Sequence, residues 1–465
     1  MDKQRKAGIT RHLIDFCQGI RYEDLSKEVI DKCKYLALDF LGVASRGSIV
    51  DSTKVMYELV KDLGLDSDGG IIIGTGMRAA YQYAALANGT SAHSLEMDDV
   101  VNEASLHPAV AILPAALAAS EMVGANGKKF IEAVVAGYET VIRLGKALNP
   151  SAHYAQGFHP TGTCGIFGAV VAASKIIGLD VGQMLNAMGI VGSQAAGSME
   201  FLAEGAWTKR MHPGWAAHSG IIAALLAKKG FKGPSAILEG RYGFLHAYSP
   251  SSDVDIILEG LGETYQIMKT SIKPHACCRY KQAPIDGILS IIEQNHLKEA
   301  EIDKVTLGIL ETGFPIIVKP EELKYNPKSV VDAQFSMPFG AAIAMIYGKA
   351  TLDEYIQQNV DSGKVKHVMK KVVCVKDPEL EKEFPKKWPA SVSILTKEGK
   401  EYSTRIDYPK GDPENPLTWD ELIEKFETLV APVFPLERVK EIISRVRELE
   451  QVDNLRYFSE QLVIY

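Results

Sequence analysis

The chain has 465 residues, of which 46% are hydrophobic and 23% are charged, and its formal net charge is −7 at pH 7. This much apolar sequence excludes a mainly disordered chain and is enough for a large core. The acidic balance argues against nonspecific binding to nucleic acid, which needs a basic surface, so we expect no nucleic-acid partner.

Residues 1–20 are charged and then amphipathic, without the apolar segment of a signal peptide. The longest apolar stretches, such as 221–227, are too short to span a bilayer. The six cysteines include no CxxC pair and no zinc-ligand spacing, which indicates free thiols in a reducing compartment. We therefore expect a cytoplasmic protein with no membrane partner.

The sequence up to about residue 265 is typical of helices. Several segments have apolar residues at helical spacing, and others are rich in alanine and glycine, which let helices approach closely. Two of the later segments are apolar over much of their circumference, which is typical of buried helices. The predicted helices are 24–47, 79–96, 108–124, 127–148, 165–179 and 181–198.

After about residue 265, lysine becomes frequent and β-branched runs alternate with short helical segments. The runs at 304–313, 370–377 and 390–407 predict strands, the last one folded at the turn 397–400. The segment 329–348 between them predicts a helix. This region is therefore expected to be a smaller α+β unit.

Two helical segments return after the proline-rich connector 411–418. Thr418 followed by Glu421 predicts a capping box at the start of the first one. Because the two ends of the chain share a helical character, the sequence predicts a mainly α fold. We expect a large all-helical domain formed by residues 1–267 and 406–465, and a smaller α+β domain over 268–405.

Eight of the eleven histidines lie between positions 93 and 275. His107, His159 and His212 each lie next to a proline, and we expect them at the ends of helices, where a side chain can face a cleft. A structural role is the alternative for each of them. Their clustering favours a role in chemistry for at least two.

The segment 93–99 combines a histidine with three carboxylates, those of Glu96, Asp98 and Asp99. Carboxylates this close repel one another, so one of them has a raised pKa or needs a cationic partner. One could orient a histidine and fix its tautomer. A solvated turn or a helix N-cap is the alternative. No HExxH motif is present, and we expect no metal site.

Two basic clusters are candidates for anion binding. The first holds Lys209, Arg210 and His212 among glycines and tryptophans, and the second holds Lys273, His275 and Arg279 at the expected domain junction. Cations at such a junction suit the binding of carboxylates, whereas a surface basic turn is the alternative. The glycine runs lack the context of phosphate or dinucleotide loops, and GxSxG is absent.

Taken together, these pieces resemble the MmgE/PrpD family, which includes 2-methylcitrate dehydratase, cis-aconitate decarboxylase and iminodisuccinate epimerase. The resemblance covers nearly the whole chain in order. The matching segments are 36–48, 87–121, 136–148, 157–179, 192–234, 273–286, 332–345 and 415–426.

The resemblance implies a large helical domain with a smaller lid, a homodimer and no required cofactor. It also implies chemistry at a carbon next to a carboxylate of a small polycarboxylate. Cations would stabilise the charge that develops when the α proton leaves, and histidines would serve as base and acid. We predict catalytic roles for Asp98, Asp99, His107, His159 and Lys209. We predict substrate binding by Glu96, Arg210, His212, Lys273, His275 and Arg279.

Three positions depart from the family pattern. Val100 stands where some members have threonine or glycine, and neither Cys278 nor Gln282 is the histidine that many members carry in the lid. Our leading hypothesis is a cofactor-independent dehydratase of a hydroxy-polycarboxylate such as 2-methylcitrate. The alternatives are an epimerase of a small dicarboxylate, a cis-aconitate-type decarboxylase and a polycarboxylate-binding protein without activity.

Overall fold

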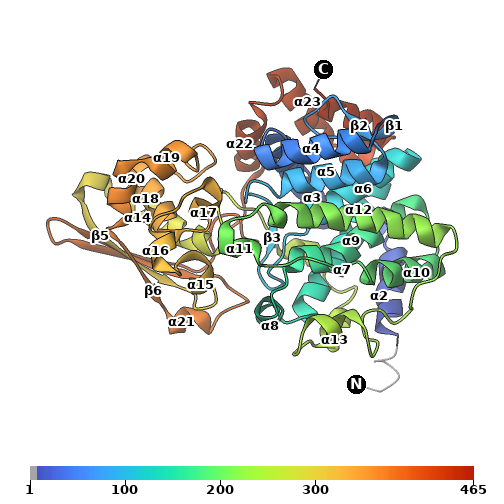
Figure 1. Ribbon diagram of the computed structural model, residues 1–465, viewed down its shortest axis with the longest axis horizontal. Helices are drawn as coiled ribbons and strands as arrows, with labels where there is room; N and C mark the ends of the chain where they lie inside the picture. The colour runs from blue at the N-terminus through green and yellow to red at the C-terminus, as the bar shows by residue number, and fades with distance from the viewer. Residues whose placement is uncertain (1–7, 465) are drawn as a thin grey trace.

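The computed structural model describes residues 8–464 and confirms the mainly α fold. A large helical part and a smaller part with one sheet lie side by side (Figure 1). The helices of the large part before the junction are α2 (Ile9–Gly19), α3 (Lys27–Gly47), α4 (Asp51–Leu63), α5 (Tyr81–Ala92), α6 (Ala109–Val123), α7 (Gly127–Ala147), α8 (Pro150–Ala155), α9 (Pro160–Ile177), α10 (Val181–Gly192), α11 (Phe201–Glu204), α12 (Thr208–Lys228) and α13 (Phe244–Tyr248).

Helix α9 lies at the centre of the large part, in contact with α6, α7, α10 and α12. All 18 of its residues are buried. By length and composition it could cross a bilayer, but here it is surrounded by other helices, as in the core of a folded domain. Its apolar circumference therefore reflects its central position.

Glycines allow the central helices to touch at the backbone. A Cβ on Gly89 of α5 would lie 2.7 Å from the Cα of Gly214 of α12. A Cβ on Gly137 of α7 would lie 3.0 Å from the carbonyl oxygen of Gly168 of α9. Side chains larger than hydrogen would push these pairs of helices apart.

The large part is not entirely helical, which corrects the prediction. Strand β1 (Leu65–Ile71) pairs antiparallel with β2 (Arg78–Ala79), and β3 (Val100–Val101) pairs antiparallel with β4 (Thr270–Ser271). Strands of two residues are too short to show a period in sequence. The helix predicted over 79–96 ends at Ala92, so the acidic segment lies in a loop.

The smaller part is built on a four-stranded sheet of order β6-β5-β7-β8. Its strands are β5 (Ile302–Ile309), β6 (Val372–Lys376), β7 (Ala390–Thr396) and β8 (Glu401–Ile406). The last three lie in the predicted runs, and β5 begins two residues before the run predicted over 304–313. The pair β5–β6 is parallel, and β5–β7 and β7–β8 are antiparallel. The helices of this part are α14 (Gln282–Asn295), α15 (Phe314–Ile317), α16 (Glu321–Lys324), α17 (Val330–Gln334), α18 (Met337–Tyr347), α19 (Gln357–Asp361), α20 (Gly363–Met369) and α21 (Pro378–Glu381).

The helix predicted over 329–348 is two helices, α17 and α18. The Ser336 side chain accepts from the N–H of Phe339 and so starts α18 anew. Ser and Thr side chains cap helices well because they satisfy an N–H that has no partner in the first turn.

The end of the chain returns to the large part as α22 (Trp419–Val430), α23 (Leu436–Arg447) and α24 (Leu455–Ser459). Helix α22 packs on α3, and α24 packs on α6. The predicted capping box of Thr418 and Glu421 is present. The assignment of 1–267 with 406–465 to one domain remains a prediction.

The contact between α5 and α12 can be tested with Gly214→Ala. The new methyl group would lie 2.3 Å from the carbonyl oxygen of Leu86, so we expect the free energy of unfolding to fall by about 1–3 kcal/mol. Gly19→Ala is the control, because a Cβ there meets nothing within 4 Å and should leave stability unchanged or raised by about 0.5 kcal/mol. Equal stability of both variants in urea denaturation would contradict a backbone contact at this point.

Candidate active site

A cavity lies where the large and the smaller part meet. Both parts contribute to its wall, as is common for ligand sites. The lining residues are Glu96, Val100, Ser105, His107, Tyr154, His159, Met199, Phe201, Leu202, Lys209, Cys278, Arg279, Tyr280, Ile316, Phe335 and Trp388.

The short β3–β4 ladder brings the acidic segment and the second basic cluster together. Val100 pairs with Ser271, so the residues just before β3 lie near those just after β4. Asp98 and Lys273 thereby come within 3.6 Å of each other (Oδ1 to Nζ). The ladder thus crosses the junction between the two parts.

The carboxylate of Asp98 is the centre of the site. Its Oδ2 lies 2.8 Å from the Nδ1 of His93 and 3.1 Å from the Nδ1 of His107, so two imidazoles share one oxygen. The side chains of Asp98, His93 and Lys273 are fully buried. Asp98 Oδ1, His93 Nε2 and Lys273 Nζ have no hydrogen-bond partner among residues 8–464, so the cluster retains unused polar atoms.

Burial and charge act in opposite directions on this cluster. Burial alone would raise the pKa of Asp98, but the neighbouring imidazoles of His107 and His93 and the ammonium of Lys273 outweigh it and hold the pKa well below its usual value. For His93, burial outweighs the attraction of Asp98 and lowers the pKa to about 4. Near neutral pH the site therefore holds an ionised Asp98 and a neutral His93.

The position of the proton on His107 follows from its partners. Its Nδ1 lies 2.5 Å from the backbone carbonyl oxygen of Asp99 and 3.1 Å from the carboxylate of Asp98. Both partners are acceptors, so Nδ1 carries the hydrogen and donates it. In the neutral ring, Nε2 is then left with the lone pair of a base.

His159 is the N-cap residue of α9, as expected for a histidine at a helix end, and its Nδ1 lies 3.0 Å from the Nδ1 of His212. Burial, followed by the nearby His93 and His212, lowers the pKa of His159 well below its usual value. The expectation for His212 was wrong, because it lies inside α12 and not at its end. A Cβ on Gly162 would lie 3.1 Å from the Cβ of His212, so glycine at this point leaves room for the pair.

Lys209 lies in the first turn of α12 and forms a buried ion pair with Glu96. Glu96 also lies 3.9 Å from Lys273 (Oε2 to Nζ). Its backbone has a φ of 58°, and Ser105, which also lines the cavity, has a φ of 49°. Side chains with a Cβ rarely adopt this conformation, and such strain is concentrated at functional sites.

Arg279 lines the cavity and is held by residues from distant segments. Its guanidinium donates to Asp412 at 2.5 Å and to Asn102 at 2.8 Å, and it lies over the ring of Trp388. Asp412 also accepts from Ser271 at 2.6 Å. The chain thus crosses the junction a second time near Asp412, and this crossing fixes Arg279.

Six of the eleven predicted site residues do not line the cavity. Asp98, His212 and Lys273 lie directly next to lining residues, 3.1 Å from His107, 3.0 Å from His159 and 3.9 Å from Glu96. Asp99, Arg210 and His275 are held by other partners. The carboxylate of Asp99 accepts from the N–H of Ala109 at 3.0 Å and from the hydroxyl of Tyr138 at 2.8 Å. Arg210 donates to Ser52 of α4 at 2.8 Å. The Nε2 of His275 lies 2.7 Å from the carboxylate of Asp286 in α14. All three side chains are thus bonded to residues outside the cavity wall.

The structure also places residues at the site that the sequence analysis did not select. His93 lies between the other two rings, with ring centroids 5.2 Å from His107 and 5.6 Å from His159. Its spacing of five residues from Asp98 was the available signal. Tyr280 and Trp388 form a stacked pair at 4.2 Å, and no motif marks them. Gln282 donates to the backbone carbonyls of His275 and Cys277 and to the Cys277 thiol, and its Oε1 accepts from the N–H of His275.

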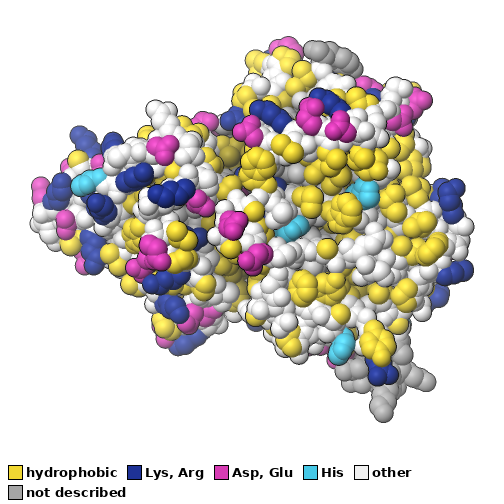
Figure 2. All heavy atoms as spheres, viewed as in Figure 1, with side chains coloured by type: hydrophobic (Ala, Val, Ile, Leu, Met, Phe, Trp, Pro, Cys, Tyr) yellow, Lys and Arg dark blue, Asp and Glu magenta, His cyan; other side chains and the backbone are white. Residues whose placement is uncertain are grey.

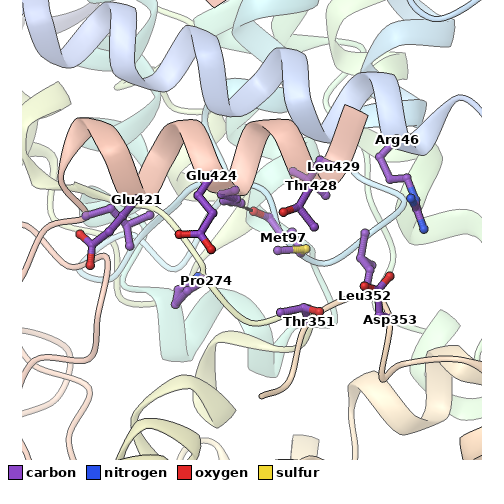
Figure 3. A pocket seen from close by; sticks show the side chains of 12 residues that line it. Arg46, Met97, Pro274, Thr351, Leu352, Asp353, Glu421, Glu424, Thr428 and Leu429 are labelled. Atoms are coloured by element: carbon purple, nitrogen blue, oxygen red, sulfur yellow. Dashed lines mark hydrogen bonds between the residues drawn. The ribbon is translucent and has the colours of Figure 1, made fainter. Parts of the chain in front are cut away.

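A second cavity lies beside Met97 and Pro274, the neighbours of the Asp98 and Lys273 pair (Figure 3). It is lined by one face of α22 and the loop 351–353, and no histidine is among its lining residues. Lys425 in its wall is engaged with Asp39 and with the carbonyl oxygen of Met97. The first cavity is therefore the better candidate for an active site, because histidines line it. Within residues 8–464, no group of three or more His, Cys, Asp or Glu side chains is placed to hold a metal ion.

Comparison with known proteins agrees with this arrangement. Residues 11–257 match the MmgE/PrpD N-terminal domain, and residues 275–451 match the MmgE/PrpD C-terminal domain. The chain belongs to the MmgE/PrpD family. The resemblance stated from the sequence is thereby confirmed.

Relatives that match this chain over nearly its full length are named as lyases. It is 28% identical to the cis-aconitate decarboxylase-like protein oryM of Aspergillus oryzae, covering 97% of this chain and 96% of the relative. It is 26% identical to the cis-aconitate decarboxylase of Aspergillus terreus, covering 99% and 97%. It is 22% identical to the 2-methylcitrate dehydratase of Salmonella typhimurium, covering 93% and 92%. These names support a lyase and leave the reaction open.

Burial of His93 makes a prediction about pH. Because the pKa of His93 is lowered to about 4 in the folded chain, its ring signals in NMR should stay in the neutral position from pH 8 to pH 5. As the pH falls, the unfolded chain takes up this proton near pH 6.5, whereas the folded chain takes it up only near pH 4. The free energy of unfolding should therefore decrease as the pH falls from 6.5 to about 4. His93→Gln should flatten that decrease. A His93 signal that titrates near pH 6.5 would contradict this protonation state.

Proposed function

We propose that the protein is a cofactor-independent hydro-lyase, which removes water from a small hydroxy-polycarboxylate by α-proton abstraction and β-elimination. The observation that carries the proposal is a pair of imidazoles, His107 and His159, in the wall of one cavity beside the ion pair of Lys209 and Glu96. Such an elimination needs a base, an acid and cationic groups for carboxylates, and these residues supply all three.

His107 suits the role of the base. Its Nδ1–H is held by Asp98 and by the carbonyl oxygen of Asp99, which leaves the Nε2 lone pair for the proton next to the substrate carboxylate. The ionised Asp98 then stabilises the imidazolium that forms.

His159 suits the role of the acid. When the Nδ1–H of His212 donates to the Nδ1 of His159, the hydrogen of the neutral His159 ring is on Nε2. That proton passes to the departing hydroxyl, which leaves as water, and the His159 ring is left as an imidazolate that the Nδ1–H of His212 stabilises until a proton returns from solvent. The elimination thus moves one proton onto His107 and one proton from His159, and exchange with solvent restores both.

Cations near the bases stabilise the charge that develops on the substrate carboxylate. Lys273 is buried, and its ammonium group makes no hydrogen bond within the described chain, so it has donors to give. Lys209 and Arg279 line the cavity. Donors fixed in advance in a dry site are worth more than in water.

A decarboxylase is the second candidate, because the fungal relatives of higher identity are named cis-aconitate decarboxylases. In that reaction the substrate loses CO₂, and an imidazole protonates the carbon atom that carried the lost carboxylate. The two reactions share the cations and the acid but differ in the need for a base.

The assignment is tested by NMR of the protein with a panel of hydroxy-polycarboxylates in D₂O. We expect exchange of a proton next to a carboxylate and formation of an alkene. His107→Ala and His159→Ala should each lower the rate about 10²–10⁴-fold. His246→Ala, at an exposed position away from the cavity, is the matched control and should retain the full rate.

The products separate the candidates. Release of CO₂ without an alkene formed by water loss would replace the hydro-lyase with the decarboxylase. Full activity in both histidine variants would overturn the acid–base assignment. Loss of activity with a chelator, restored by a divalent metal ion, would overturn independence from a cofactor.

We also propose that the protein acts in the cytoplasm as a homodimer. All six cysteines are free thiols, which suits a reducing compartment.

Hydrophobic side chains gather over α4, α5 and α12 on the face shown in Figure 2. On α4, Val55, Leu59 and Leu63 repeat every four residues and are 47–61% exposed, and Met211 and Trp215 continue the face on α12. Monomers rarely leave such a continuous apolar face uncovered, and a twofold dimer covers both copies at once.

The dimer is tested by light scattering coupled to size-exclusion chromatography. We expect the native protein to elute with twice the mass of the chain, and Leu59→Lys with Trp215→Lys to shift it to the monomer. Leu323→Lys, at an exposed position on α16 in the smaller part, is the control and should stay dimeric. A native protein that is monomeric at micromolar concentration would contradict the proposal.

A further inference from the structure

Two kinds of side chain line the cavity, charged or imidazole groups and apolar side chains, and the second set is called its apolar side. The charged and imidazole groups are those of Glu96, His107, His159, Lys209 and Arg279. Most of the remaining wall is aromatic or aliphatic. This apolar side consists of Val100, Tyr154, Met199, Phe201, Leu202, Cys278, Tyr280, Ile316, Phe335 and Trp388.

The aromatic rings lie directly against the groups that would react. Phe201 meets the ring of His159 edge-on, with centroids 5.9 Å apart. The ammonium of Lys209 lies 5.0 Å from the centre of the Phe335 ring. A substrate held by the cations and histidines therefore has its remaining substituent against aromatic carbon.

The charges of the site are already balanced within the protein. Lys209 pairs with Glu96, Lys273 lies 3.6 Å from Asp98, and Arg279 pairs with Asp412 at 2.5 Å. All six side chains are at most 9% exposed. These three pairs leave no surplus positive charge on the cations, so each substrate carboxylate needs donors on these same cations.

Two substrate carboxylates can be served by the cations that line the cavity, one by the ammonium of Lys209 and one by the guanidinium of Arg279. Among the described residues, no further lysine or arginine lines the cavity. A third carboxylate would find no further cation in the wall, only hydroxyls such as those of Ser105 and Tyr280, and burying a charge without an opposite charge is strongly unfavourable. An alkyl or aryl group in that place would instead gain from burial.

We propose that the substrate is a hydroxy-dicarboxylate with an uncharged apolar substituent, and not a tricarboxylate. This inference rests on the proposed function, because it names the substrate class of the same site. Val100 and Phe201, with the stacked pair of Tyr280 and Trp388, form the subsite for the apolar substituent.

Matched malate derivatives test the inference. The probes carry a methyl, isopropyl, benzyl or carboxymethyl group on the carbon that bears the hydroxyl, the last being citrate. We expect kcat/KM for the isopropyl or benzyl compound to exceed that for citrate at least tenfold. Affinities of the same probes measured by calorimetry should follow the same order.

A variant at the rim of the apolar side provides the reciprocal test. Leu202 is 38% exposed, so Leu202→Arg can add a cation without filling the core. We expect it to lower the preference for the apolar probe over citrate at least tenfold. Leu202→Gln is the control, because it removes the apolar surface without adding charge and should not improve citrate. Thermal unfolding of both variants verifies that they are folded.

The outcomes separate this inference from the proposed function. Turnover of citrate at a rate equal to or above that of the apolar probes would overturn the inference and leave the hydro-lyase in place. If no probe reacts, the hydro-lyase fails, and the order of affinities still decides the substrate class. Citrate binding as tightly as the apolar compounds would then overturn the inference as well.

Discussion

The buried carboxylate of Asp98 is the interaction on which the rest of the site depends. A charge without water must find its partners inside the protein, and those of Asp98 come from both sides of the junction. His93 and His107 approach from the large part, and Lys273 approaches from the strand that enters the smaller part. The β3–β4 ladder holds these segments in register. The proposed chemistry and the contact between the two parts therefore depend on the same residues.

The balance of charges in the site explains why His93 and His159 are neutral. The cations that line the cavity each face a carboxylate, in the pairs Lys209–Glu96 and Arg279–Asp412. In such a balanced and dry environment, nothing compensates a further positive charge, so burial keeps the rings of His93 and His159 neutral. Neutral rings with fixed hydrogens can take a proton on one side and give one on the other. The environment, more than any single residue, therefore sets the protonation states on which the proposed acid–base chemistry depends.

Much of the fold and part of the site follow from the sequence. Helical period, alternating strands and the capping box at Thr418 depend on neighbouring residues, and the structure shows them where they were expected. His107, His159 and Lys209 reach the cavity because helix starts carry them there. Asp99 and His275 do not reach it, because Tyr138 and Asp286 hold them, and these partners lie 39 and 11 positions away. Such competition between partners is decided by tertiary structure and leaves no local pattern.

The return of the chain end to the large part has a consequence for synthesis on the ribosome. Gly127 at the start of α7 packs against the carbonyl of Leu449, where a Cβ would come within 1.6 Å. Lys34 in α3 donates to the carbonyl of Arg447. The first half of the protein therefore emerges with core surfaces whose partners are more than 300 residues away in sequence. Contacts this distant form late, so the large part has to wait for the smaller one to be made before it can close, and nascent chains depend on protection from aggregation during that interval.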